Sequence, residues 1–218
     1  LAGSDEERLD DLVAALRAPG VGALWCARGG YGTSRILDRL PRPEPRWLVG
    51  YSDITALHLW LFGHGIASVH GPMVAGLGKH RGDDALARTL DILRTGRIPS
   101  LAVSETLVEG SATAPLIGGN LSLLAALAAG PCWPTGRPFL LAVEDVGEPP
   151  YRVDRMLTTL RHVGALETCR GIVVGDFATA SHPFDDYRPL FVELGTAIGV
   201  PVVVSATFGH GRQNMPWV

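Results

Sequence analysis

One serine in this sequence stands where a nucleophile could act. Ser52 lies in the run Gly50-Tyr51-Ser52-Asp53, between a segment typical of a short strand and a segment typical of a helix. A sharp strand-to-helix turn of this kind exposes the serine hydroxyl and places the backbone N–H of the next residue, Asp53, beside it. The second glycine of the G-x-S-x-G pattern is absent, and serine and aspartate are also preferred at helix N-caps. The run therefore predicts either a nucleophile turn or a purely structural cap.

An acidic residue ends a strongly apolar strand later in the chain. Glu144 follows the apolar run at residues 139–143, and a carboxylate at the end of a buried strand is costly unless it is paired. Asp145 and Glu148 are the alternatives, although Glu148 precedes a predicted helix, where an acid simply favours the helix dipole. We interpret Glu144 either as the partner of a catalytic base or as a strand-end residue that accepts hydrogen bonds from loop amides.

Seven histidines compete for the role of a general base. His210 stands in Gly209-His210-Gly211 directly after a predicted strand, where the two glycines let the backbone turn tightly and leave the imidazole uncrowded. His70, which follows another predicted strand, is the main alternative. The other five, on predicted helices or near loops, are His58, His64, His80, His162 and His182. With His210 as the base, the chain order is serine, acid, histidine, which is the order of the α/β-hydrolase triad and also recurs on unrelated folds.

Two glycine-rich loops could bind an anion through backbone N–H groups. Arg28-Gly29-Gly30-Tyr31-Gly32 and Gly118-Gly119-Asn120 each lie between a predicted strand and a predicted helix. The first is not G-x-G-x-x-G and lacks the acid that should follow, which argues against a dinucleotide site. Tight packing of a helix on a strand is the structural alternative for both loops. If Ser52 is a nucleophile, we expect the Asp53 N–H and one N–H from Gly29 or Gly30 to bind the oxyanion.

Composition and motifs exclude several other classes of function. There is no H-E-x-x-H and no paired C-x-x-C, and His182 near Asp185 and Asp186 is interpreted more simply as a solvated loop, so we expect no metal and no cofactor. The formal net charge of −3 offers no basic surface for nucleic acid. No apolar run approaches the roughly 20 residues that span a bilayer, so no membrane contact is expected. Three cysteines in or beside apolar segments favour reduced thiols and a cytoplasmic protein.

Alternating strands and helices must position these side chains. The 218 residues are 46% hydrophobic and 19% charged, enough for a folded chain with a sizeable core. We predict an α/β fold of two lobes, each a mostly parallel sheet flanked by helices: an N-terminal lobe over residues 1–100, a linker over 101–115 and a C-terminal lobe over 116–218. Ligands of such open sheets bind at the carboxyl ends of strands, where the candidate side chains stand. The chain begins without Met and stops just after a loop, so we expect it to be truncated at both ends.

Hydrophobic periodicity gives approximate limits for the elements. Predicted strands cover residues 21–26, 47–50, 66–69, 115–117, 139–144, 172–175 and 201–205. Predicted helices cover residues 33–40, 53–62, 83–94, 120–129, 151–163 and 187–198. A further helix begins after a capping box of Ser4 and Glu7 and ends near Pro19 and Gly20.

Several segments of the chain resemble those of one enzyme family, the LD-carboxypeptidases, which are the muramoyltetrapeptide carboxypeptidases of the S66 serine peptidases. They are residues 1–8, 27–32, 50–57, 70–73, 118–121, 144–155 and 209–211 followed by Asn214. The resemblance covers essentially the whole chain, although the family's first strand region and final strands have no counterpart in it. It implies a triad in which Ser52 is the nucleophile, His210 the general base and Glu144 its orienting carboxylate. It also implies that the active site lies between an N-terminal lobe carrying the serine and a C-terminal lobe carrying the other two residues.

The same resemblance implies a substrate and a partner. The substrate is a peptidoglycan-derived peptide, a tetrapeptide cleaved between a diamino acid of L stereochemistry and a terminal D-alanine. A carboxypeptidase must also bind the free carboxylate of that D-alanine, for which Arg28 and the turn ending at Asn120 are the candidates. Family members are commonly dimers, so the resemblance implies a homodimer.

Three other functions fit the same residues. Microcin immunity proteins of this family use the triad to cut an aminoacyl-nucleotide conjugate and need an aromatic loop for the nucleobase. Trp133 and Trp217 could stack on a base, but core packing is the simpler interpretation. Residues 144–155 are more similar to the peptidoglycan enzymes.

A non-catalytic small-molecule-binding module would be favoured by loss of a triad member, and none is lost. A general esterase would accept simple acyl esters.

Overall fold

Three short parallel strands form the first sheet of the structure, a computed structural model that describes residues 2–77, 84–177, 179 and 181–218. The strand order is β1-β2-β3, with β1 at Ala23–Trp25, β2 at Trp47–Gly50 and β3 at Val69–His70. β2 pairs with both neighbours and ends at Gly50, two residues before Ser52. The carboxyl end of the central strand therefore carries the candidate nucleophile.

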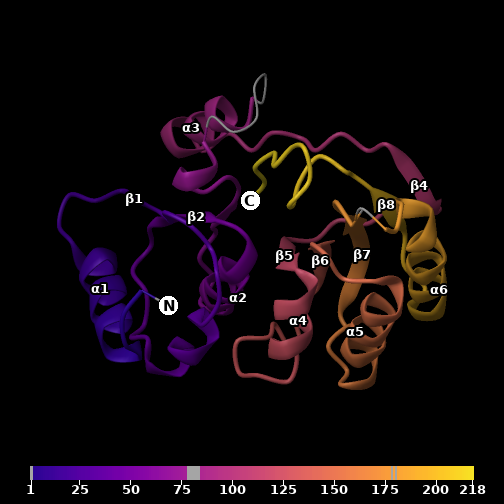
Figure 1. Cartoon of the computed structure of the whole chain (residues 1–218), viewed down its shortest axis with the longest axis horizontal. Coiled ribbons are helices and arrows are strands. Elements are labelled where there is room, and N and C mark those ends of the chain that lie inside the picture. The colour runs from indigo at the N-terminus through magenta and orange to yellow at the C-terminus, as the bar shows by residue number, and fades with distance from the viewer. Residues whose placement is uncertain (1, 78–83, 178, 180) are drawn as a thin grey trace.

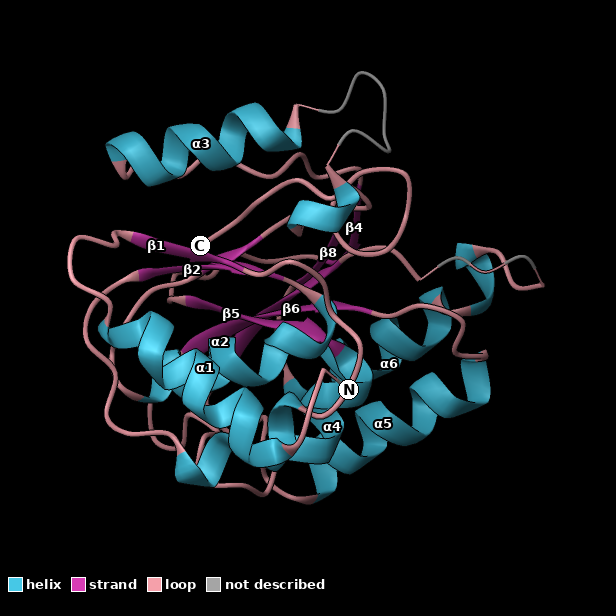
Figure 2. Ribbon diagram, turned by 60° about the vertical axis from the view of Figure 1, so that its left-hand side comes forward, coloured by secondary structure: helices cyan, strands magenta, loops and turns pink. Residues whose placement is uncertain are grey.

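Helices cover both faces of this first sheet. α1 (Asp5–Arg17) and α2 (Thr55–Gly63) lie on one side, and α3 (Ala85–Thr95) lies on the other (Figure 2). Successive residues of a strand face opposite sides of the sheet. β2 shows this alternation, because Leu48 packs among side chains of α1 and α2 whereas Val49 packs against a side chain of α3.

The second sheet has five strands in the order β4-β8-β7-β6-β5, in which β4 is antiparallel to β8 and the remaining pairs are parallel. The strands are β4 (Glu105–Val108), β5 (Leu116–Asn120), β6 (Phe139–Glu144), β7 (Cys169–Val174) and β8 (Val202–Val204). Helices α4 (Leu121–Leu127), α5 (Pro150–His162) and α6 (Arg188–Ile198) lie along one face of it (Figure 1). Their buried side chains pack with Phe139, Leu141 and Val143 of β6. The central strand β6 is thus anchored on its helix side, and Glu144 ends it.

α2 connects the two sheets. Its Leu57 and Leu61 belong to the core of the first sheet, whereas Leu59 packs with Leu121 in the core of the second. Figure 1 shows α2 next to β5 and α4, and it packs directly against both of these elements. Because α2 follows the Ser52 turn, the candidate nucleophile is attached to the element that touches both lobes.

Most predicted elements are found, with one helix predicted wrongly. The capping box is confirmed, since the Ser4 hydroxyl accepts from Glu7 N–H and the Glu7 side chain accepts from Ser4 N–H. The helix predicted at residues 33–40 is instead two 3-10 turns, η1 (Thr33–Arg35) and η2 (Leu37–Arg39). Gly32 has a φ of 102° before this segment and a proline-rich stretch follows it, so the segment is too short for a cooperative α-helix.

Several other boundaries differ from the prediction: β5 extends to Asn120 and so includes the predicted glycine loop 118–120, and β7 begins at Cys169 instead of residue 172. Part of the predicted linker at 101–115 forms β4 at the edge of the second sheet, while the division into residues 1–100, 101–115 and 116–218 stays a prediction. The helix predicted at 53–62 begins as the 3-10 turn η3 (Ser52–Ile54) and continues as α2. The predicted start of α3 at residue 83 lies outside the described residues. Among the helices of the described part of the chain, none is long and apolar enough to cross a membrane.

Candidate active site

Ser52 has a backbone conformation that side chains rarely adopt. Its φ is +62°, and among the described residues it is the single non-glycine residue with a positive φ. The left-handed region crowds the Cβ atom of an L-residue, so it persists only where the surrounding structure enforces it. A strained serine between a strand and a helix is the arrangement of a nucleophile turn, which makes the hydroxyl accessible beyond the end of the strand.

A buried histidine helps to enforce this turn. His58 of α2 places Nε2 3.0 Å from the carbonyl oxygen of Gly50 and Nδ1 2.8 Å from Ser68 Oγ. A carbonyl oxygen can only accept, so Nε2 carries the hydrogen and the Ser68 hydroxyl donates to Nδ1. Burial lowers the pKa of His58 to about 4, although the bond to Gly50 opposes this shift. A neutral imidazole therefore holds the backbone two residues before Ser52.

The side chain of Asp53 holds the first glycine-rich loop. Asp53 Oδ2 accepts hydrogen bonds from Thr33 N–H at 3.0 Å and from the Thr33 hydroxyl at 2.7 Å, and all three groups are buried. The loop then passes beside the nucleophile, because a Cβ added to Gly29 would lie 3.2 Å from Ser52 Cβ and 3.4 Å from Ser52 Oγ. The predicted neighbourhood of Gly29 and the Ser52 hydroxyl is thus present. Arg28 beside the loop is exposed.

Gly30 and the tip of the same loop face solvent. Gly30 has a φ of 139° with no heavy atom within 4 Å of an added Cβ, and Tyr31 is 69% exposed. The far end of the loop is bound to α1, because Arg8 Nη1 donates to the Gly32 carbonyl at 3.2 Å. The loop therefore has fixed ends around an open tip.

Glu144 and His210 form a direct pair. His210 Nδ1 lies 2.7 Å from Glu144 Oε2, and the Glu144 side chain is completely buried. The close approach depends on Gly209, which has a φ of 114° and where an added Cβ would lie 2.8 Å from Glu144 Oε2. The side chain of Asn214 accepts from Gly209 N–H at 3.2 Å and holds the loop in place. The Gly-His-Gly run predicted as an uncrowded turn is in fact tightly packed on its Glu144 side.

The two members of this pair shift each other's protonation. Burial raises the pKa of Glu144, while the hydrogen bond and charge of His210 oppose the rise. Burial lowers the pKa of His210, but the hydrogen bond and charge of Glu144, with the charges of Asp145 and Asp176, outweigh it and leave that pKa above its usual 6.5. Glu144 thus stabilises the protonated imidazole.

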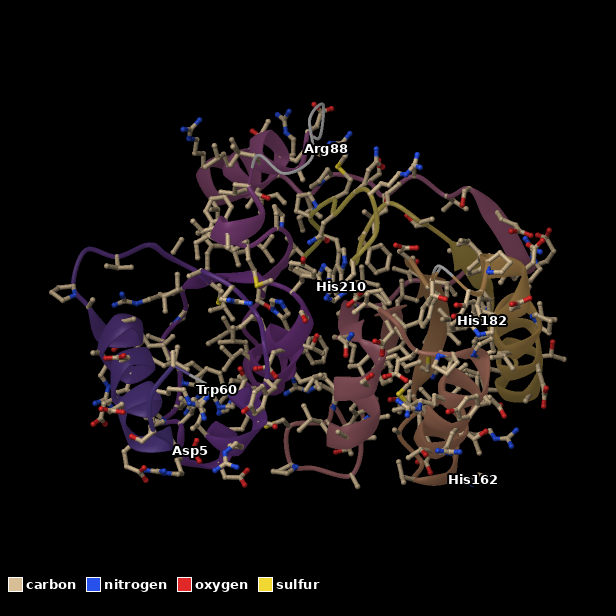
Figure 3. All side chains as sticks on the ribbon, in the orientation of Figure 1. Asp5, Trp60, Arg88, His162, His182 and His210 are labelled. Carbon is tan, nitrogen blue, oxygen red and sulfur yellow. The ribbon has the colours of Figure 1, made fainter. Side chains whose placement is uncertain are left out.

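Tyr51 brings His210 to the nucleophile turn. The ring centroids of Tyr51 and His210 are 4.8 Å apart with a tilt of 54°. Since Tyr51 directly precedes Ser52, this contact joins the histidine of the second lobe to the turn of the first. Figure 3 shows His210 in the region between the two lobes, below the C-terminal loop. The sequence offered no signal for this role of Tyr51, nor for that of His58.

Asp145 and Glu148, the alternatives to Glu144, pair with residues other than His210. Asp145 Oδ2 accepts from the N–H and hydroxyl of Ser122, and its Oδ1 accepts from Asn120 Nδ2 at 3.0 Å. Glu148 forms an ion pair with Arg152. Asn120 itself is buried, and its polar atoms bond within the protein: Oδ1 accepts from Leu123 N–H and the backbone N–H donates to a side chain of α2. These contacts indicate a structural role for Asn120 at the end of β5, a segment that the sequence predicted as a turn and as one candidate for binding a substrate carboxylate.

The alternative base, His70, is buried, and neither of its ring nitrogens has a hydrogen-bond partner among the described residues. Its ring stacks on Trp217 with centroids 4.8 Å apart, and burial holds its pKa well below 6.5. Both residues border a mainly apolar groove of about 530 Å³. Trp133, the other aromatic considered for stacking on a base, is 5% exposed and donates from Nε1 to the Ala165 carbonyl, as core packing predicts. His182 pairs with Asp186 at the surface.

No group of three or more metal-ligating side chains is found in the part of the chain that the structure describes. The three cysteines, Cys26, Cys132 and Cys169, are free. His80, one of the histidines considered as a base, lies outside the described residues.

Comparison with known proteins adds independent information. Residues 1–71 match the family described as the LD-carboxypeptidase N-terminal domain, and residues 113–218 match the LD-carboxypeptidase C-terminal domain. A murein tetrapeptide carboxypeptidase of Pseudomonas aeruginosa is 35% identical, with 100% of this chain and 76% of the relative covered.

Two solved structures are similar over nearly the whole chain. A muramoyltetrapeptide carboxypeptidase from Oxalobacter formigenes superposes with a TM-score of 0.86 at 30% identity, covering 100% of this chain and 79% of that one. An MccF-like protein from Bacillus anthracis gives 0.85 at 25% identity, covering 98% and 75%. The two-sheet α/β arrangement is therefore that of known proteins.

Proposed function

Because the chain belongs to the LD-carboxypeptidase family of S66 serine peptidases, we propose that it releases the terminal D-alanine from peptidoglycan-derived tetrapeptides with Ser52, His210 and Glu144 as its triad. The observation that carries this proposal is the His210 Nδ1 to Glu144 Oε2 contact of 2.7 Å, made by a histidine whose ring contacts Tyr51, directly before a serine held at a φ of +62°. An acid-oriented imidazole next to a strained serine turn is the arrangement that acyl transfer requires.

Each residue of the triad has one chemical task. Ser52 Oγ attacks the carbonyl carbon of the last peptide bond while His210 Nε2 accepts the hydroxyl proton, which needs about 2.6–3.2 Å between these atoms in the reacting complex. His210 then donates that proton to the leaving nitrogen of D-alanine, and a water activated in the same way hydrolyses the acyl-enzyme. Glu144 keeps the hydrogen on Nδ1 and stabilises the imidazolium form.

The oxyanion is proposed to bind between the nucleophile turn and the first glycine-rich loop. The Asp53 N–H follows the nucleophile directly, and Gly29 passes so close to Ser52 that a Cβ added to it would lie 3.4 Å from Ser52 Oγ. Gly30 offers the alternative second donor. One such donor contributes about 3 kcal/mol to stabilisation of the transition state.

Arg28 is the proposed partner of the free substrate carboxylate. It is exposed and adjoins Gly29. A guanidinium binds a carboxylate with two parallel hydrogen bonds and so fixes the end of the peptide. Asn120 at the end of β5 is less suited to this role, because its polar atoms bond within the protein.

The peptidoglycan substrate is favoured over an aminoacyl nucleotide. Trp133 and Trp217, the two rings considered for stacking on a nucleobase, are 5% and 4% exposed and so offer no free ring face. The 35% identity to a murein tetrapeptide carboxypeptidase also exceeds the 25% identity to the MccF-like protein. We further propose that the protein is cytoplasmic and forms a homodimer. Sedimentation of the purified protein tests its oligomeric state.

The proposal predicts D-alanine release from a purified tetrapeptide, measured by coupled D-amino-acid oxidation. Ser52→Ala should abolish release, whereas Ser181→Ala, at an exposed serine, should leave it unchanged. Turnover that survives in Ser52→Ala rules out this nucleophile. Cleavage of an aminoacyl sulfamoyl adenylate in place of the tetrapeptide identifies the microcin-type activity. Turnover of p-nitrophenyl acetate alone identifies a general esterase.

A further inference from the structure

The proposed triad is divided between two lobes, so its geometry depends on how the lobes are joined. Ser52 follows β2 of the first sheet, whereas Glu144 ends β6 and His210 follows β8 of the second. A hydrogen bond from the backbone N–H of Asn120 to Thr55 Oγ1, 2.9 Å long and buried, crosses between the lobes next to these residues. We propose that Thr55 is a positioning residue, whose hydroxyl holds the nucleophile turn in register with Glu144; this inference rests on the proposed function.

On the first lobe, Thr55 is rigidly connected to the nucleophile. It is the first residue of α2 and follows the 3-10 turn η3 (Ser52–Ile54) without a break. The N–H of Thr55 bonds back to the carbonyl oxygens of Ser52 and Asp53, and its side chain is completely buried. A shift of Thr55 is therefore transmitted to Ser52 through a single helical turn.

On the second lobe, Asn120 is rigidly connected to the acid. It ends β5 and is the direct neighbour of Glu144 in the parallel ladder between β5 and β6. Its side chain caps α4 through Leu123 N–H and donates to Asp145 Oδ1. A shift of Asn120 is therefore transmitted to the strand end that carries Glu144.

The glycines before Asn120 permit the close approach of Thr55. Gly119 has a φ of 136°, and an added Cβ would collide with Thr55 Oγ1 and lie 3.1 Å from Thr55 Cγ2. Gly118 has a φ of 143°, and an added Cβ would collide with the Ala142 carbonyl. Gly119 thus permits the close packing of helix α2 on strand β5, which is the structural alternative considered for this segment from the sequence, whereas Gly118 permits the close pairing of β5 with β6.

Loss of the Thr55 hydroxyl should misalign the triad without removing any group that reacts. The Asn120 N–H would remain buried without an acceptor, so the contact between α2 and β5 must relax. A displacement of about 1 Å in catalytic geometry can cost on the order of 100-fold in rate. The effect belongs to kcat, because Thr55 is buried and does not line the path of the substrate.

The test compares variants of the purified protein that separate the hydroxyl from side-chain volume. Thr55→Val keeps the shape and removes the acceptor, and we expect kcat to fall about 10- to 100-fold with KM within about twofold. Thr55→Ser keeps the acceptor and should restore kcat to within about threefold of the original protein. Thr89→Val is the matched control: Thr89 is equally buried but bonds to Ala85 within α3, so kcat should not change. Circular dichroism and thermal unfolding verify that each variant is folded.

The outcomes separate the proposal from its alternatives. A folded Thr55→Val protein with unchanged kcat overturns it, and so does a Thr55→Ser protein that is as slow as Thr55→Val, since volume would then be the cause. If Thr55→Val does not fold, Thr55→Ala and Thr55→Ser replace it, because both lack Cγ2 and only serine keeps the oxygen; equal kcat in these two overturns the inference. The labelling rate of Ser52 by a fluorophosphonate gives a readout that needs no peptide substrate. If the protein labels normally and Thr55→Val labels slowly, while no tetrapeptide is cleaved, the proposed substrate fails and the role of Thr55 stands.

Discussion

The phenol ring of Tyr51 lies against the imidazole of His210, with 4.8 Å between the ring centroids. Of the described contacts, this one connects the residue before Ser52 with the residue that Glu144 orients. Aromatic contacts of this kind stabilise by about 0.5–1.5 kcal/mol beyond the area they bury. Tyr51 therefore limits how far His210 can turn away from the nucleophile.

Truncation of Tyr51 should slow the reaction through this contact. We expect Tyr51→Ala to lower kcat about 10-fold, since about 1.4 kcal/mol corresponds to that factor, and Tyr51→Phe to stay within about twofold. Steady-state kinetics on the tetrapeptide measure both values. Equal losses in the two variants would assign the effect to the phenol hydroxyl and contradict the ring contact.

The pH dependence should report the pairing of His210 with Glu144. His210 accepts a proton only when neutral, and its pKa lies above 6.5, so kcat/KM should rise with pH through a midpoint above 6.5. Glu144→Gln removes the charge that raises this pKa while burial still lowers it. The midpoint should then move to lower pH, and the plateau rate should fall on the order of 10,000-fold.

A matched acid provides the control for this pH profile. Glu148 pairs with Arg152, so Glu148→Gln should keep the midpoint of the original protein. A midpoint that stays in place or moves upward in Glu144→Gln would show that this carboxylate does not set the protonation of the base.

Removal of the Asp53 carboxylate should loosen the glycine-rich loop. Asp53→Ala leaves the buried N–H and hydroxyl of Thr33 without their acceptor, so the free energy of unfolding should fall by about 2 kcal/mol. Asp53→Asn keeps an acceptor oxygen and should lose less. Urea unfolding followed by circular dichroism measures the difference, and equal losses would mean that charge, not the accepted hydrogen bonds, stabilises the loop.

A methyl group at Gly29 should interfere with the nucleophile and leave the fold intact. The added Cβ would lie 3.2 Å from Ser52 Cβ, a tight contact, so Gly29→Ala should reduce kcat/KM on the order of 10-fold. Gly22→Ala is the control, since nothing lies within 4 Å of a Cβ there. Full activity in Gly29→Ala would place the oxyanion donors elsewhere.

The features of this structure that could be predicted are those set by residues close together in the sequence. The apolar run that ends in Glu144 gave the limits of β6, and the capping residues gave the start of α1. The serine turn was predictable because its flanking strand and helix are adjacent in sequence. The edge strand β4 was missed, because a short strand containing polar residues carries little alternating signal.

Contacts between distant segments could not be predicted from the residues alone. Glu144 and His210 are 66 positions apart, and Thr55 and Asn120 are 65 apart. The choice of His210 over His70 needed either the resemblance to a family or the observed pairing with a carboxylate. In the sequence, a glycine pair that packs against a threonine looks the same as one that binds an anion. Only the atoms that surround the glycines in the folded structure distinguish the two roles.

The neutral His58 beneath the nucleophile turn makes the whole fold sensitive to acid. Its pKa falls from 6.5 to about 4 on folding. Between these two pH values, His58 is protonated in the unfolded chain and neutral in the folded chain. The contribution of His58 to stability therefore stays constant above pH 6.5 and declines as the pH drops below it, by about 3 kcal/mol near pH 4. Mild acidification should first protonate His210 and so stop catalysis reversibly. Only a further drop in pH should unfold the protein.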